Sequence, residues 1–353
     1  LRNAVVLFPC SGKVLIMSTG TAAKNTSLRS SLLLLLCATL WGTTFVAQSI
    51  ASDIIQPFTY LACRSLLGFV CVLPLALLLN RNRSASAAEH SVSGLKDSSS
   101  ENKIVSPGAS VSSEARSSSA PRKSLLLIGG LLCGLFLCTA SFLQQTGIGG
   151  TTVGKAGFIT ALDIVIVPIL GLFLKRYCSP LVIPAVVLAI VGFYLLCIKE
   201  GFSVNRADLI VLISSFVYSL QILTVDHFSR IVNPIRLSCL QLLFCGLFSM
   251  VCAFLFESPD LSAIWACRGP IAYAGILSSA VAYTLQILGQ RGLHPAAASL
   301  LMSLESVIAA LSGLLILGDA LSSRELLGCV LVFAAVILAQ LPVPHRKKPD
   351  PAS

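Results

Sequence analysis

Residues 124–146 read SLLLIGGLLCGLFLCTASFLQQT, a stretch of 23 residues without a single Asp, Glu, Lys or Arg. An α-helix rises about 1.5 Å per residue, so a helix of about 20 residues matches a hydrocarbon core roughly 30 Å thick. This stretch therefore predicts a helix that crosses a membrane, and the chain repeats the pattern on both sides of it.

Further apolar runs of about the same length accompany this one. The ten expected spans cover about residues 31–51, 58–79, 124–146, 154–174, 181–198, 207–225, 235–256, 270–290, 296–317 and 323–341. We therefore expect an all-α integral membrane protein with ten transmembrane helices, surrounded by a lipid bilayer.

The composition excludes an ordinary soluble protein. Of the 353 residues, 55% are hydrophobic and 11% are charged, whereas charged residues make up about 25% of soluble domains. The net charge of +10 does not predict a nucleic-acid partner, because the basic residues are scattered between apolar runs rather than clustered on a polar domain. The 13 cysteines include no C-x-x-C pair and lie mostly inside apolar runs, so no metal site is expected.

The basic residues also predict an orientation. Ten spans put both termini on one side, and 19 Lys and Arg residues then fall in the tails and loops of that side, against five on the other. Short loops rich in Lys and Arg stay in the cytoplasm. We expect a multi-pass protein of the inner (plasma) membrane with both termini cytoplasmic.

Three segments lie outside the spans. Residues 1–27 form an N-terminal tail, in which we expect translation to begin naturally at Met17. Residues 80–123 are rich in Ser and contain no aromatic residue, a composition that cannot bury a core and predicts a disordered cytoplasmic linker. Residues 342–353 form a basic C-terminal tail.

The two halves of the chain resemble each other. A shift of 142 positions gives eleven identities in an ungapped window of 33 residues, pairs Gln144 with Gln286 and sets Asp163 opposite Glu305. A shift of 177 aligns Trp41 with Tyr218. We expect two five-helix repeats, the first formed by residues 28–79 and 124–198 and the second by residues 207–341. Because each repeat crosses the membrane an odd number of times, the second is inverted, which is an architecture of secondary transporters.

Three ionisable side chains are expected inside the spans. A charge at the centre of a membrane helix costs about 2.5–3.5 kcal/mol on insertion scales and marks a functional site by default. Asp163 and Glu305 lie near the middle of their spans, so they are candidates to bind a substrate amine or a proton; the alternative is a protonated or hydrogen-bonded role in helix packing. Arg64 either binds an anionic group or extends its head group to the membrane surface.

Four uncharged side chains complete the candidate site. Gln144 and Gln286 lie near the ends of the third and eighth spans, and Trp41 and Tyr218 lie about halfway along the first and sixth. All four can line a substrate cavity. The alternative is that the two Gln residues join neighbouring helices by hydrogen bonds and that the two aromatic rings pack against them.

Two motifs resemble the EamA family of the drug/metabolite transporter (DMT) superfamily. They are LWGTTFV at residues 40–46 and SLESVIAALSGLLILGDALS at residues 303–322, and the resemblance extends from Leu28 to Leu341 apart from the Ser-rich linker. Ser306 replaces a Pro of the family motif S-L-E-P-V, so a weaker kink is expected there. The resemblance implies a bacterial inner-membrane permease that exports amino acids or other small metabolites without ATP.

We therefore predict a secondary transporter that exports a small metabolite by alternating access. Its expected ligands are that small molecule and, as a second candidate, a proton, and no cofactor is expected. An enzyme is not predicted, because the sequence contains no H-E-x-x-H, no G-x-S-x-G and no Ser/His/Asp arrangement. The alternative function is a non-transporting membrane sensor or assembly partner that acts through its Ser-rich linker.

Overall fold

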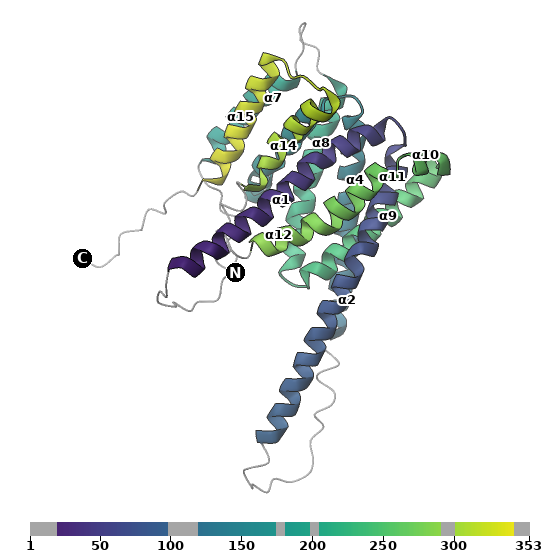
Figure 1. Cartoon of the computed structure of the whole chain (residues 1–353), viewed down its shortest axis with the longest axis vertical. Helices are drawn as coiled ribbons and strands as arrows, with labels where there is room; N and C mark the ends of the chain where they lie inside the picture. Colours follow the sequence, from purple (N-terminus) through teal and green to yellow (C-terminus); the bar gives the residue numbers. More distant parts are fainter. Residues whose placement is uncertain (1–19, 98–118, 174–180, 198–204, 291–300, 342–353) are drawn as a thin grey trace, which may run out of the picture.

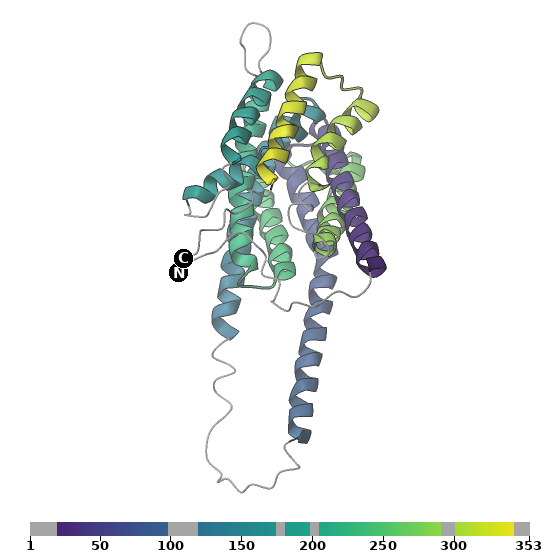
Figure 2. The same cartoon turned by 90° about the vertical axis from the view of Figure 1, so that its left-hand side faces the viewer.

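The computed structural model describes residues 20–97, 119–173, 181–197, 205–290 and 301–341, and every regular element in these ranges is a helix. The helices pack side by side in one bundle, and the end of α2 extends well beyond it (Figure 1, Figure 2). The expected start at Met17 and the C-terminal tail lie outside the described residues. The first part of the Ser-rich segment, residues 80–97, continues α2 as a helix.

The elements follow one another in two groups separated by residues 198–204. The first group is α1 (Gly20–Ser52), α2 (Pro57–Asp97), α4 (Ser119–Ile148), α5 (Val153–Thr160), α6 (Asp163–Phe173) and α7 (Val182–Cys197). The second is α8 (Arg206–Ser229), α9 (Pro234–Phe256), α10 (Leu261–Ala266), α11 (Arg268–Ala272), the π-helix η1 (Tyr273–Ala282), α12 (Tyr283–Gln290), α14 (Leu304–Ser312), the π-helix η2 (Gly313–Leu317) and α15 (Ser323–Gln340).

Six helical segments of the described chain are long and apolar enough to cross a membrane. They are Leu28–Ser52, Pro57–Leu78, Ser124–Ile148, Val153–Gly171, Arg206–Ser229 and Pro234–Phe256. Two shorter apolar helical stretches, Val182–Leu196 and Leu304–Leu317, lie in further expected spans. The prediction of an all-helical integral membrane protein is confirmed in this form, while the count of ten spans stays a prediction.

The outer surface of the bundle is apolar. Large hydrophobic side chains such as Ile183, Phe254 and Leu315 are at least 72% exposed, although other Leu and Ile side chains fill the core. Water would not tolerate so many exposed side chains of this kind, whereas the acyl chains of a bilayer would.

Small residues bring the helices of the two groups close together. A Cβ atom on Gly42 of α1 would lie 2.6 Å from the carbonyl oxygen of Glu305, and one on Gly134 of α4 would lie 2.6 Å from the Cβ of Phe244. Glycine at such positions allows close helix contacts in membranes. Through contacts of this kind, α1 packs on α14, η1 and α12, and α4 packs on α8 and α9.

Candidate functional site

Two interrupted helices bring the candidate carboxylates into the bundle. The helix that begins at Val153 stops at Thr160, and α6 begins at Asp163 after the turn formed by Ala161 and Leu162. In the second group, Ser303 is a turn between the helical residues 301–302 and α14. The shift of 142 places Ala161 on Ser303, so both interruptions fall at related positions.

Both acidic residues lie in the first turn of the helix that follows the interruption. Asp163 is the first residue of α6, and Glu305 is the second residue of α14. The two side chains are close enough to interact electrostatically. No basic side chain in the described ranges lies within salt-bridge distance of either carboxylate. Such a pair of like groups offers a site for a cation or a proton.

A chain of hydrogen bonds links the polar side chains around these carboxylates. The Tyr218 hydroxyl lies 2.8 Å from Ser141 Oγ and donates to Gln144 Oε1 at 3.3 Å. Gln144 Oε1 also accepts from Gln48 Nε2 at 3.2 Å, and Gln144 Nε2 donates to Thr160 Oγ1 at 3.1 Å. Because Thr160 ends α5, this network leads from the core of the bundle to the interruption before Asp163.

An aromatic pair forms another part of the candidate site. The rings of Trp41 and Tyr283 meet edge to face with their centroids 5.2 Å apart, and Trp41 Nε1 donates to the carbonyl oxygen of Ser278 at 3.1 Å. Tyr283 was not among the predicted site residues. The shift of 142 places it on Ser141, the partner of Tyr218, while Tyr218 itself aligns with Trp41. The contact between Trp41 and Tyr283 and the contact between Tyr218 and Ser141 therefore involve corresponding positions of the two halves.

Arg64 of α2 lies near the tyrosines of this cluster. Its guanidinium carbon is 5.8 Å from the centroid of the Tyr60 ring, and Tyr218 and Tyr283 lie near it. Both of these tyrosines also lie near Glu305. Tyr218 and Tyr283 are therefore close to one basic and one acidic side chain.

Gln286 is the predicted residue with the weakest connection to this cluster. Its Nε2 lies 3.6 Å from the Met302 sulfur, whereas its related residue Gln144 takes part in the hydrogen-bond network. The six other predicted residues lie near one another through the contacts above. No group of three metal-binding side chains converges within the described part of the chain.

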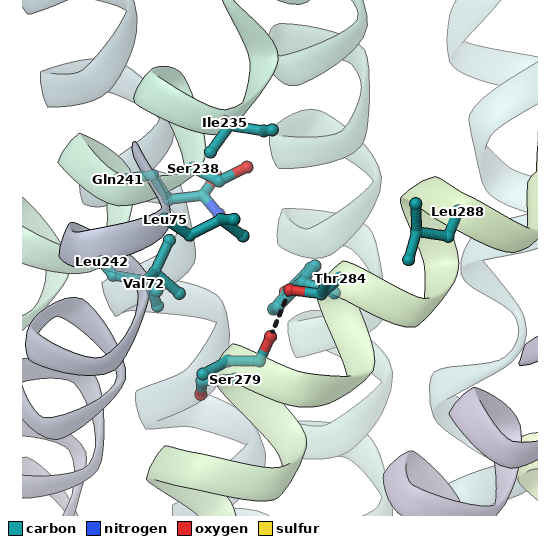
Figure 3. A pocket seen from close by; sticks show the side chains of 11 residues that line it. Val72, Leu75, Ile235, Ser238, Gln241, Leu242, Ser279, Thr284 and Leu288 are labelled. Carbon is teal, nitrogen blue, oxygen red and sulfur yellow. Dashed lines mark hydrogen bonds between the residues drawn. The ribbon is translucent and has the colours of Figure 1, made fainter. Parts of the chain in front are cut away.

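A pocket of about 210 Å³ opens next to Tyr283 (Figure 3). It is formed by α2, α9, η1 and α12, and its lining residues are Val72, Leu75, Ile235, Ser238, Gln241, Leu242, Ser279, Ala280, Tyr283, Thr284 and Leu288. The pocket lies toward what we call the linker end of the bundle, where α2 leaves it and α9 begins.

A buried ion cluster closes the other end of the bundle, the cap end, where α5, α8 and α15 begin. Lys155 Nζ lies 2.5 Å from Glu325 Oε1 and 3.8 Å from Asp208 Oδ2, and both Lys155 and Asp208 are almost fully buried. This cluster was not predicted from the sequence. The partners of Lys155 lie far along the chain, and no local pattern pointed to them.

Further polar contacts join the two halves at the cap end. The Thr151 hydroxyl donates to Asp208 Oδ1, and Asp319 Oδ2 accepts from the backbone N–H of Val153 at 3.0 Å. Glu257 accepts from the backbone N–H groups of Phe58 and Thr59, where α2 begins, at 2.7 and 2.8 Å. A carboxylate satisfies the free N–H groups of a helix start and complements its positive dipole end.

Comparison with known proteins shows what this chain is similar to in sequence and in fold. Residues 205–341 match the EamA-like transporter family. A protein from Archaeoglobus fulgidus described as an uncharacterized transporter is 26% identical over 346 residues, which cover 97% of this chain and 95% of that protein. A solved structure, titled only as the crystal structure of a protein, superposes with a TM-score of 0.52 at 18% identity and covers 88% of this chain and 96% of its own.

Proposed function

We infer that this chain, of which residues 205–341 match the EamA-like transporter family, is a membrane transporter that exports a small polar metabolite, such as an amino acid, across the cytoplasmic membrane by alternating access. The observation that carries this proposal is the carboxylate pair Asp163 and Glu305, which follows two helix interruptions at related positions and has no basic partner among the described residues. Broken helices at the interface of inverted repeats commonly form the substrate site of secondary transporters.

The arrangement supports a ten-helix fold with two inverted five-helix repeats. The related interruptions before Asp163 and Glu305, and the related contacts of Trp41 and Tyr218, are what such a repeat would produce. Helices from the two halves pack mainly against each other, so the site lies between them. A change in how the halves meet would move access to the site from one end to the other.

The two ends of the bundle differ in a way that fits one stage of this cycle. Ionic and backbone contacts between the halves hold the cap end together, whereas a pocket lies open beside Tyr283 toward the linker end. With both termini in the cytoplasm, the cap end faces outward and this conformation faces inward. Transport then requires that the contacts around Lys155 separate while new contacts form near the pocket.

Flux measurements on the purified protein test the proposed transport directly. Proteoliposomes would be loaded in turn with isotope-labelled amino acids, amines and organic acids, and efflux would be compared with that from empty liposomes. We expect saturable efflux of at least one amine-bearing solute. Background efflux across the whole panel would contradict the proposal and favour a non-transporting role.

The variant Glu305→Gln tests whether the carboxylate pair couples a proton. The amide keeps the shape of the side chain but cannot take up or release a proton, so flux driven by a pH gradient should fall at least tenfold while substrate binding remains. Asp226→Asn is the matched control, because it removes a carboxylate that pairs with Arg230 near the surface at 2.8 Å. Unchanged gradient dependence in Glu305→Gln would rule out the proton role.

A further inference from the structure

We propose that the pocket beside Tyr283 binds the apolar part of an amphipathic substrate whose polar head lies near Glu305 and Asp163. The inference rests on the proposed transport function and narrows its substrate class from polar metabolites to solutes with a polar head and an apolar chain or ring. Tyr283 connects the two regions, since it lines the pocket and packs on Trp41, whose neighbour Gly42 lies so close to α14 that a Cβ there would be 2.6 Å from the Glu305 carbonyl oxygen.

The pocket wall is chemically apolar. Val72, Leu75, Ile235 and Leu242 supply much of its surface, and Figure 3 shows their side chains gathered on one side of the space. Several polar groups in the wall already have partners inside the protein, because their hydrogen bonds run to neighbouring residues. Thr284 Oγ1 donates to the Ala280 carbonyl, Ser279 Oγ donates to the Ala274 carbonyl, and Gln241 Oε1 accepts from Gln221.

The size of the pocket fits a ring or a short alkyl chain. At about 210 Å³ it exceeds the roughly 150 Å³ of an engineered apolar cavity that binds benzene. A pocket this small holds the side chain of a metabolite rather than a large hydrophobic molecule. Compact polar solutes would leave it unfilled and lose the gain in affinity that burying apolar surface provides.

Chain-length series test this inference with a binding signal that does not depend on flux. The protein contains two tryptophans, Trp41 and Trp265, and Trp265 is exposed at 71% on α10, so Trp265→Phe leaves Trp41 as a fluorescent reporter next to Tyr283. The probes are linear 2-amino acids from alanine to 2-aminooctanoic acid and the n-alkylamines from methylamine to octylamine. We expect affinity in at least one series to rise about fourfold per methylene and then level off as the pocket fills.

Substitutions that fill the pocket should remove the increase of affinity with the chain length of the probe. Ala280→Phe and, from the facing helix α9, Ser238→Leu add bulk to the wall at two independent places, so a folding defect in one does not decide the test. Val281→Phe is the matched control, because Val281 is adjacent but 36% exposed and does not line the pocket. Both filled variants should bind the shortest probes as the reference protein does and lose the increase with chain length.

The outcomes separate this inference from the proposed function. Chain-length-dependent binding without flux would contradict transport and leave the pocket assignment standing. Flux with flat binding across both series would overturn the pocket assignment and leave transport standing. An increase that never levels off, and that Ala280→Phe and Val281→Phe change equally, would indicate general partitioning into the lipid phase and would also overturn it.

Discussion

Lys155 and Glu305 show two ways in which one bundle holds a charged side chain. Lys155 lies between the carboxylates of Asp208 and Glu325, so its positive charge is paired inside the protein and joins helices at the cap end. Among the described residues, Glu305 has no basic partner within salt-bridge distance, and the acidic group that acts on it is Asp163. The sequence predicted that Glu305 lies near the middle of its membrane span, because apolar stretches of similar length lie on both sides of it. It could not predict the environment of Lys155, which depends on two residues from distant helices.

Removing the Lys155 charge should destabilise the protein strongly. Lys155→Met removes the cation that lies between the carboxylates of Asp208 and Glu325, and breaking a buried ion pair by removing one partner costs about 3–5 kcal/mol. We expect a lower melting temperature in detergent, measured by the change in intrinsic fluorescence. The double variant Lys155→Met/Asp208→Asn should recover part of the loss, since it removes both charges. Equal melting temperatures for Lys155→Met and the reference protein would show that the cluster contributes nothing to stability.

At the scale of helices, the sequence predicted a span at residues 154–174, and Val153–Gly171 is long and apolar enough to form one, but the helix is interrupted between α5 and α6. Neither Ala161 nor Leu162 is a helix breaker, and the nearest Pro, Pro168, lies inside α6. The related helix is interrupted at Ser303 even though Ser306 replaces the Pro of the family motif. Local helix propensity therefore does not reveal either interruption.

The close approach of α1 to α14 gives a prediction about how Glu305 is positioned. Gly42→Val would place side-chain atoms against the Glu305 carbonyl, and overpacking of this kind costs about 1–3 kcal/mol. We expect a lower melting temperature together with weaker substrate binding, because the start of α14 must shift. Gly269→Val is the control, since a Cβ at Gly269 meets nothing within 4 Å. Similar effects of the two substitutions would contradict a specific role for Gly42.

For the whole molecule, hydropathy predicted the membrane class and the place of most helices, because a span of about 20 apolar residues is a strong local signal. Self-comparison also paired Asp163 with Glu305, which the structure brings within electrostatic range. The aromatic contact of Tyr283 and the pocket beside it depend on how separate helices meet. No spacing within a single helix encodes that arrangement.

The orientation of the whole chain can be tested with reporters. Fusions at the C-terminus and at residue 105 of the Ser-rich segment should both be cut by protease added to inside-out membrane vesicles and protected in right-side-out vesicles. An insertion after Ser258, between α9 and α10, serves as the control and should show the reverse pattern. Protection of the C-terminal fusion in inside-out vesicles would contradict a cytoplasmic terminus.

The ion cluster of Lys155, Asp208 and Glu325 has a consequence for the speed of the proposed cycle. When the cap end separates, the three charges must lose one another before water fully reaches them, although they are well hydrated once it is open. The barrier between the two conformations can therefore be high even when their free energies are similar. Added salt screens exposed charges far more than buried ones, so exchange between the conformations should be slow and nearly independent of ionic strength.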